Sequence, residues 1–177
     1  MVTVTVAART LAVGDPYQGG IVAYILEPGD PGYSASVQHG LIAATADQSA
    51  GIIWATADYQ SSASSGAYGM AIGTGNQNTI HIVAQNGAGT TYAAGLARAC
   101  ADGGYNDWYL PSRDELDKLY VNRAAIGGFN ATAGSWYWSS SEQEPYPNGA
   151  ESQDFANGLS DYWLKSLLYR VRAVRAF

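Results

Sequence analysis

The order of the periodic segments is the feature that most constrains the fold of this chain. Two helical patterns, Thr91 to Ala101 and Ser112 to Arg123, lie in the middle and are followed only by strand patterns. The second begins with a capping box: Ser112 can accept from the third helical amide while Glu115 reaches back. Helices and strands in separate runs are typical of an α+β domain with antiparallel sheets. We therefore predict an α+β fold with two helices.

Strand predictions flank these helices on both sides. Gly20 to Leu26 (GIVAYIL) is a continuous apolar run between a glycine and a turn, which fits a buried strand. The other strand candidates are Leu41 to Ala44, Ile52 to Ala55, Ser135 to Ser141 and Tyr169 to Arg175. Ser61 to Gly89 is rich in Ser, Gly, Asn and Thr, and we predict loops wrapped over the domain there.

The length of 177 residues suits one domain. Val2 to Val6 alternates with threonine, so residues 1–13 are predicted to form a strand or leader ahead of a domain at 14–177. The start lacks the basic and apolar regions of a signal peptide. Either export depends on something else or the chain is a fragment of a longer protein. No run approaches the roughly 18 apolar residues of a membrane span, which argues against membrane insertion.

The composition favours binding over other roles. Only 14% of the residues are charged, against roughly 25% in an ordinary soluble domain, and the chain holds 21 Gly, 13 Tyr and 5 Trp. Tyr, Ser, Gly and Asn are the residues that binding loops prefer, and the profile is common in extracellular and viral binding domains. The net charge of -6 and the lack of any Lys or Arg between Arg123 and Lys165 argue against nucleic acid.

The chain offers no recognisable set of catalytic groups. His39 and His81 lie far apart without a carboxylate pattern that would complete a metal site. Cys100 is the only cysteine, which excludes disulfides within the chain, and we interpret it as a small core residue on a helix. Ser139 to Ser141 lacks a base to activate a nucleophile and is better interpreted as a buried strand end that satisfies its own polar groups. We predict no enzyme, no metal and no cofactor.

The segment between Glu142 and Asp161 holds five carboxylates, no cation and interspersed aromatics. A solvated loop is the simplest interpretation, but the segment and the residues after it carry more apolar surface than such a loop needs. Some of these side chains belong to the core, and the rest would form an exposed patch of the kind that marks binding sites. We predict a ligand-binding surface of nine residues pointing outward on one face: Tyr146, Asn148, Ser152, Asp154, Asn157, Leu159, Asp161, Tyr162 and Tyr169.

Three motifs together carry a family resemblance. They are Gly104 to Ser112 (GYNDWYLPS) with Glu115 close behind, Tyr137 to Glu142 (YWSSSE), and Val171 to Phe177 (VRAVRAF). Jointly they resemble the C-terminal domain family of bacterial collagen-like adhesins, over about residues 14–177. The resemblance implies the formylglycine-generating-enzyme type of C-type lectin fold. The enzyme branch of that fold uses a reactive cysteine pair, which a chain with one cysteine cannot supply.

A narrower resemblance is to the variable proteins of diversity-generating retroelements, such as phage tropism determinants. These end in the same fold, with a constant frame around positions whose adenines are mutated. The implied frame is Trp138 to Glu142, Ala150, Gln153, Phe155, Gly158, Lys165 and Val171 to Phe177. Seven of the nine predicted surface residues, all but Tyr146 and Tyr169, are compatible with mutated asparagine-like codons, whereas Gln143, Glu151 and Trp163 are not. Glu144 to Asn148 (EPYPN) is only superficially similar to a calcium-binding lectin motif, and calcium is not predicted.

The sequence therefore predicts a receptor-recognition domain at a cell surface or on a virion, with a cell-surface protein or glycan as its ligand. Two alternatives stay open: a structural module that caps a fibre, and an enzyme of the formylglycine-generating type. Assembly into a homo-oligomer also stays open.

Three structural expectations can be checked directly. Trp108 and Trp138 should be buried, because a large aromatic stabilises a core by about 2–3 kcal/mol. The closing strand should lie beside Gly20 to Leu26. Arg172 and Arg175 should have carboxylate or carbonyl partners, since an unpaired buried guanidinium is costly.

Overall fold

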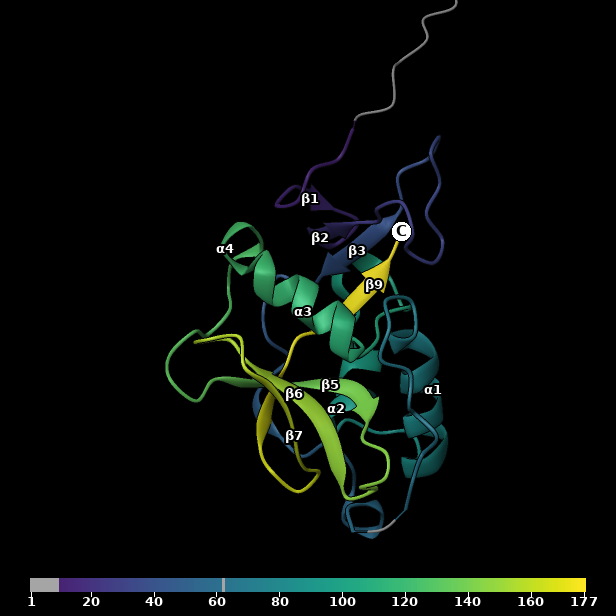
Figure 1. Cartoon of the computed structure of the whole chain (residues 1–177), viewed down its shortest axis with the longest axis vertical. Coiled ribbons are helices and arrows are strands. Elements are labelled where there is room, and N and C mark those ends of the chain that lie inside the picture. Colours follow the sequence, from purple (N-terminus) through teal and green to yellow (C-terminus); the bar gives the residue numbers. More distant parts are fainter. Residues whose placement is uncertain (1–9, 62) are drawn as a thin grey trace, which may run out of the picture.

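The computed structural model describes residues 10–61 and 63–177, and it shows two β-sheets at opposite ends of the molecule with α3 between them (Figure 1). The strand predicted at Val2 to Val6 lies outside the described residues. The helices are α1 (Gly75–Asn86), α2 (Ala93–Arg98), α3 (Arg113–Val121) and α4 (Arg123–Ile126). The strands are β1 (Pro16–Tyr17), β2 (Gly20–Ile25), β3 (Gly40–Ala43), β4 (Ser49–Ile52), β5 (Trp136–Glu142), β6 (Gly149–Asp154), β7 (Ser160–Leu164), β8 (Tyr169–Val171) and β9 (Val174–Ala176).

The first sheet has the strand order β1-β2-β3-β9, and all its pairs are antiparallel. The second has the order β4-β8-β5-β6-β7, in which only the β5–β8 pair is parallel. The expected α+β architecture is therefore confirmed. None of the helices in the described part of the chain is long and apolar enough to cross a membrane.

The closing strand differs from its prediction in two ways. The segment from Tyr169 to Arg175 is split between β8 in the second sheet and β9 in the first. In addition β9 pairs with β3, with Ile42 opposite Arg175, so it does not lie directly beside β2. The reason is that the chain turns back after β2 and places β3 between the two. The strand predicted at Ile52 to Ala55 is also shifted, because β4 ends at Ile52.

The two arginines near the end of the chain have the partners that the sequence predicted. Arg172 is buried and donates from Nε to Asp47 at 2.8 Å and from Nη2 to the Gly128 carbonyl at 2.7 Å. Arg175 binds the Asp107 carboxylate with two nitrogens, at 2.7 and 2.8 Å. These contacts tie the end of the chain to three loops, those that hold Asp47, Asp107 and Gly128.

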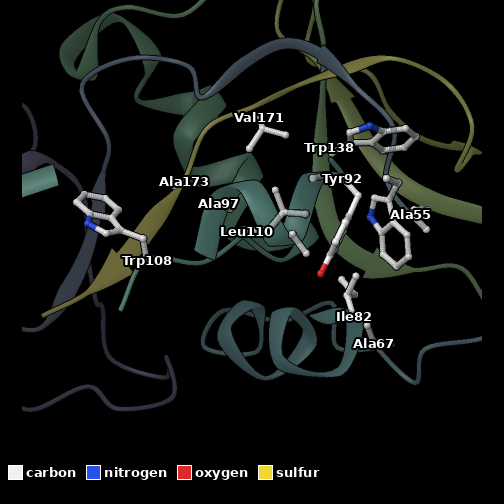
Figure 2. Packing of buried hydrophobic residues seen from close by; sticks show 14 of the residues in the cluster. Ala55, Ala67, Ile82, Tyr92, Ala97, Trp108, Leu110, Trp138, Val171 and Ala173 are labelled. Atoms are coloured by element: carbon white, nitrogen blue, oxygen red, sulfur yellow. The ribbon is translucent and has the colours of Figure 1, made fainter. Parts of the chain in front are cut away.

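The core confirms both tryptophan predictions. Trp108 and Trp138 are fully buried, with 0% of their surface exposed. In Figure 2, Tyr92, Leu110 and Ile82 lie close together between the helices and the sheet, and they belong to one buried cluster with Trp138. The indole N–H of Trp138 donates to the Ile52 carbonyl at 2.8 Å, so the core satisfies this polar atom as well.

The prediction of two helices was wrong, because the described residues form four α-helices. The largest error concerns α1, which lies in the segment predicted to be loops. Its sequence, GNQNTIHIVAQN, is poor in strong helix formers, and no side chain caps it locally. The support is tertiary instead. Glu115 accepts from the N–H of Gly73 at 2.8 Å just before the helix, and the Asn78 amide donates to the Gly69 carbonyl at 2.6 Å.

The start of α3 confirms the predicted capping box. Ser112 Oγ accepts from the Glu115 N–H at 3.3 Å, and Glu115 Oε2 accepts from the Ser112 N–H at 2.8 Å. Glu115 is fully buried, and burial raises the pKa of its carboxyl group although backbone hydrogen bonds oppose this shift. One carboxylate therefore holds the beginnings of both α1 and α3.

Candidate functional site

The hairpin of β6 and β7 lies at one edge of the five-stranded sheet (Figure 1). β6 is the inner strand, paired with β5 on one side and β7 on the other, and all six of its residues are buried. Among the described strands, β7 pairs with β6 alone, and all five of its residues are exposed. The hairpin thus presents an outer strand to solvent on a buried support.

The turn between the two strands is held from within and from below. The side chains of Asp154 and Asn157 each accept the backbone N–H two residues ahead, at 2.9 and 2.8 Å. Gly158 has a φ of +82°, and a Cβ at this position would lie 2.5 Å from the ring of Tyr120 in α3. Only glycine combines this φ with such close packing at low cost.

A buried ion pair ties the end of β7 to the end of β5. Lys165 directly follows β7, and its Nζ donates to Glu142 at the end of β5; neither side chain is exposed. The ammonium group also lies 4.8 Å from the centre of the Trp54 ring. The second oxygen of Glu142 accepts from the N–H and Oγ of Ser65, at 2.8 and 2.9 Å. Burial lowers the pKa of Lys165, and the hydrogen bond and charge of Glu142 oppose that shift.

The nine predicted surface residues differ in their exposure. The exposed members are Tyr146, Asn157, Leu159, Asp161 and Tyr162. Asn148 and Tyr169 are half-buried. Ser152 and Asp154 are buried, with 1% and 5% of their surface exposed, so the expectation that they point outward was wrong. Both belong to the inner strand β6, where Ser152 donates to the Asp161 carbonyl at 3.1 Å and Asp154 supports the turn.

The nine residues also do not share one face. Asp161 and Tyr162 are neighbours in β7, and successive residues of a strand point to opposite sides of the sheet. Ring contacts agree with this alternation. Tyr162 stacks on Tyr146, with centroids 5.3 Å apart and planes within 5°, whereas Trp163 contacts Trp136 of β5. The hairpin therefore carries two aromatic surfaces, one on each side of β7.

An open pocket of about 370 Å³ follows the outer edge of the hairpin. Its lining residues are Tyr146, Asn148, Gly149, Asp161, Tyr162, Trp163 and Leu164. Four of these were predicted as ligand-binding residues. Gly149 lies beneath the Tyr162 ring, because a Cβ at this glycine would come within 3.0 Å of that side chain. The pocket combines rigid aromatic walls with an amide and a carboxylate, as small-molecule and side-chain binding sites commonly do.

Several residues of these surfaces were missing from the predicted site. Trp163 is 40% exposed and Leu164 51%, and Trp136, whose ring contacts that of Trp163, is half-buried. Trp163 does not fit the codon argument, and Trp136 falls outside the segment on which the prediction concentrated. The excess of apolar residues after Asp161 was the sequence signal that could have identified these residues. Exposed aromatic side chains at a sheet edge are a stronger mark of a binding site than exposed polar ones.

The hairpin surface is acidic. Glu144 and Asp161 are exposed, and no Lys or Arg occurs between residues 124 and 164. Glu151 is almost buried; burial raises the pKa of its carboxyl group, Asp161 adds to this shift, and Arg113 opposes it. Burial likewise raises the pKa of the Tyr169 hydroxyl, and the charge of Asp161 acts in the same direction. A negatively charged ligand would meet unfavourable electrostatics here.

The reactive residue types noted elsewhere in the sequence are buried or half-buried in the structure. Ser139 to Ser141 is buried, which confirms the interpretation as a self-satisfied strand end: Ser141 Oγ donates to the Gly69 carbonyl at 2.6 Å and accepts from the Arg113 N–H at 3.0 Å. Cys100 follows α2 and is half-buried, and burial raises the pKa of its thiol. Among residues 10–61 and 63–177 no cluster of three potential metal ligands occurs.

These features place the chain in a definite class. Two sheets of this order, α3 between them and an exposed hairpin on a buried frame define an α+β, C-type-lectin-like fold, as the sequence predicted. The model of the Lcl C-terminal domain family matches residues 43–175, and the chain belongs to this family. The resemblance stated from the three motifs is thereby confirmed. The family is one of binding domains rather than of enzymes. No curated protein matches the chain.

Proposed function

We propose that this domain recognises a receptor, a protein or glycan on a cell surface, through the outer edge of the β6–β7 hairpin. The observation that carries the proposal is the contrast between β7, whose five residues are all exposed, and the buried strand β6 beneath it. Three of the exposed β7 residues are Tyr162, Trp163 and Leu164, which would be an unfavourable choice for a surface without a partner. A domain with this role would act outside the cell or on the surface of a virion.

We further propose that the surface is diversified in the manner of retroelement variable proteins. Asn148, Asn157, Leu159, Asp161 and Tyr162 fit mutated asparagine-like codons, and they are exposed or half-buried. Changes at such positions usually alter stability by no more than about 0.5 kcal/mol each, so many ligands could be sampled on one frame. A reverse-transcriptase gene beside this one, together with an imperfect repeat of the last hundred or so bases, is the expected genetic context. Its absence would contradict diversification but not receptor binding.

Binding can be tested with the fluorescently labelled chain on intact cells of several kinds and on glycan and protein arrays. Saturable binding to at least one target is expected. A triple variant, Tyr146→Ser, Tyr162→Ser and Trp163→Ser, should lose this binding while keeping its melting temperature to within a few degrees.

The matched control changes exposed apolar residues outside the hairpin and outside α3, on which the hairpin packs. Ile80 in α1 is 46% exposed and Val37 in the loop after β2 is 55% exposed, so Ile80→Ser with Val37→Ser removes similar surface elsewhere. This control should bind as the wild type does. Equal loss in both variants, or no saturable binding to any target, would contradict the proposed site.

A further inference from the structure

The side of the hairpin that carries Trp163 has an aromatic corner. The Trp163 and Trp136 rings meet at 73° with centroids 5.7 Å apart, and Trp136 in turn stacks on Tyr169 at 5.8 Å and 21°. Trp138 closes the row from within, because its ring lies 4.5 Å from that of Tyr169. The inner end of the row is therefore fixed in the core, and Trp163 at its outer end is 40% exposed.

A carboxylate lies next to this corner. Asp161 precedes Trp163 by two residues in β7, so both side chains point to the same side, about 7 Å apart along the strand. Asp161 Oδ1 accepts the Tyr162 N–H at 2.8 Å, which orients the carboxylate. The effect of Asp161 on the pKa of Tyr169 is consistent with its position near the aromatic row.

The described part of the chain supplies this carboxylate with no cation of its own. Lys165 binds Glu142, Arg113 binds Asp114, and Arg170 and Arg172 bind Asp47. The remaining described cations are engaged elsewhere: Arg98 with Asn76, Lys118 with the Tyr24 ring, Arg123 with the Tyr120 ring and Arg175 with Asp107. The Asp161 carboxylate, with the exposed indole of Trp163 beside it, is thus available to a cationic ligand.

We propose that this corner binds an arginine side chain of a protein ligand, with the guanidinium group stacked on Trp163 and hydrogen-bonded to Asp161. A planar guanidinium stacks on aromatic faces and matches a carboxylate with two parallel donors. A neutral sugar could stack on the same indole but would gain nothing from the charge of Asp161. This inference rests on the proposed function of the hairpin as a receptor-binding surface, and it specifies the chemistry of the ligand.

The five tryptophans provide the readout. The indole N–H groups of Trp54, Trp108 and Trp138 are hydrogen-bonded to backbone carbonyls inside the protein, whereas Trp136 and Trp163 line the corner. The ¹⁵N-labelled chain is titrated with N-acetyl-arginine methylamide and, separately, with N-acetyl-citrulline methylamide, which has nearly the same shape without the charge. The arginine compound should shift the Trp136 and Trp163 indole signals saturably and leave the other three unchanged.

Two variants separate a specific site from general attraction to an acidic protein. Asp161→Asn should weaken the arginine compound about fivefold or more and leave the citrulline compound unaffected. Asp58→Asn, at an exposed acid in a different part of the chain, removes the same charge and should change nothing. Trp163→Leu should abolish the shift of the Trp136 signal.

The inference is overturned if the arginine compound produces no shift, if citrulline binds equally well, or if Asp58→Asn weakens binding as much as Asp161→Asn does. A shift produced by neutral methyl glycosides but not by arginine would identify the ligand as a glycan and would also overturn it. In each of these cases the cell and array experiment still decides the proposed function, because the triple hairpin variant would lose binding to its target whatever the ligand chemistry.

Discussion

Replacement of Lys165 by methionine tests whether the buried ion pair holds the frame beneath the binding surface. The side chain of Lys165 is fully buried, and its ammonium group donates to Glu142 and, at 3.2 Å, to the Ala63 carbonyl. Methionine has a similar length and keeps the contact with the Trp54 ring, but it leaves the Glu142 carboxylate buried without its counterion. The remaining hydrogen-bond donors to the Glu142 carboxylate are Ser64 and Ser65, and neither is positively charged.

The expected loss can be estimated from this arrangement. Removal of one member of a buried pair costs about 3–5 kcal/mol, because the other charge stays desolvated. In a domain of this size, that corresponds to a decrease in melting temperature of about 6–20 °C. A double variant, Lys165→Met with Glu142→Gln, removes both charges, and the amide can still accept from Ser65. It should therefore recover most of the lost stability.

Urea unfolding followed by tryptophan fluorescence measures these free energies of unfolding. Arg113→Met is the control, because Arg113 and Asp114 form an ion pair whose side chains are 44% and 40% exposed, and such pairs contribute about 0–1 kcal/mol. If Lys165→Met costs no more than this control, or if the double variant is less stable than the single one, the role assigned to the pair is wrong.

Three further predictions concern the rest of the frame. Trp108→Ala should lower the free energy of unfolding by about 3–5 kcal/mol, measured by urea unfolding, and an unchanged melting temperature would refute the assigned core. Removal of Val171 to Phe177 should abolish folding, because it deletes β9 and both paired arginines; a soluble truncation that melts cooperatively would contradict the topology. The hydrogen bonds and charge of Arg175 lower the pKa of Asp107 below 3.8 in the folded state, so the pair stabilises the fold above pH 3.8 and this contribution disappears as the pH falls through the lowered pKa. The difference in stability between wild type and Asp107→Asn should accordingly shrink in acid, and a difference independent of pH would exclude the pair as its cause.

The sequence predicted those parts of the fold that depend on local signals. The capping box at Ser112 specifies the start of α3 through hydrogen bonds between residues three apart, and the structure contains both bonds. β2 is a continuous apolar run, and both its existence and its burial follow from that pattern. The family motifs predicted the overall architecture. Two of these motifs contain Trp108 and Trp138, which are buried in the core.

The elements that sequence reasoning missed depend on contacts between distant residues. α1 begins next to the Glu115 carboxylate, which lies about forty residues further along the chain, and its own sequence contains few residues that favour a helix. β6 (GAESQD) shows no alternation of apolar and polar residues, since it is buried between β5, β7 and α3, where several of its polar side chains form hydrogen bonds. Gln153, for example, donates to Asp117 of α3 at 2.9 Å. A polar strand buried on both sides is read from sequence as a loop.

The same limit explains the two errors within the predicted site. Ser152 and Asp154 resemble surface residues by type, and only the position of β6 inside the sheet shows that they are structural. The sequence did not predict β7 as a strand, so the alternation of side chains between the two sides of a strand could not be applied to it. Asp161 and Tyr162 were therefore assigned to one face. Composition pointed to a segment that does carry exposed side chains, but strand geometry decides which of them share a face.

The central claim is that the exposed hairpin positions contribute to binding and little to the fold. The most direct measurement is the free energy of unfolding of one combined variant, Tyr146→Ser, Leu159→Ser, Asp161→Ser and Tyr162→Ser, compared with the wild type by urea unfolding. Loss of the Tyr146–Tyr162 stack accounts for about 1 kcal/mol, and the other changes for no more than about 0.5 kcal/mol each. We expect cooperative unfolding with a total loss of about 1–2 kcal/mol. A loss above about 4 kcal/mol, or loss of the cooperative transition, would contradict it, because the hairpin would then be part of the frame.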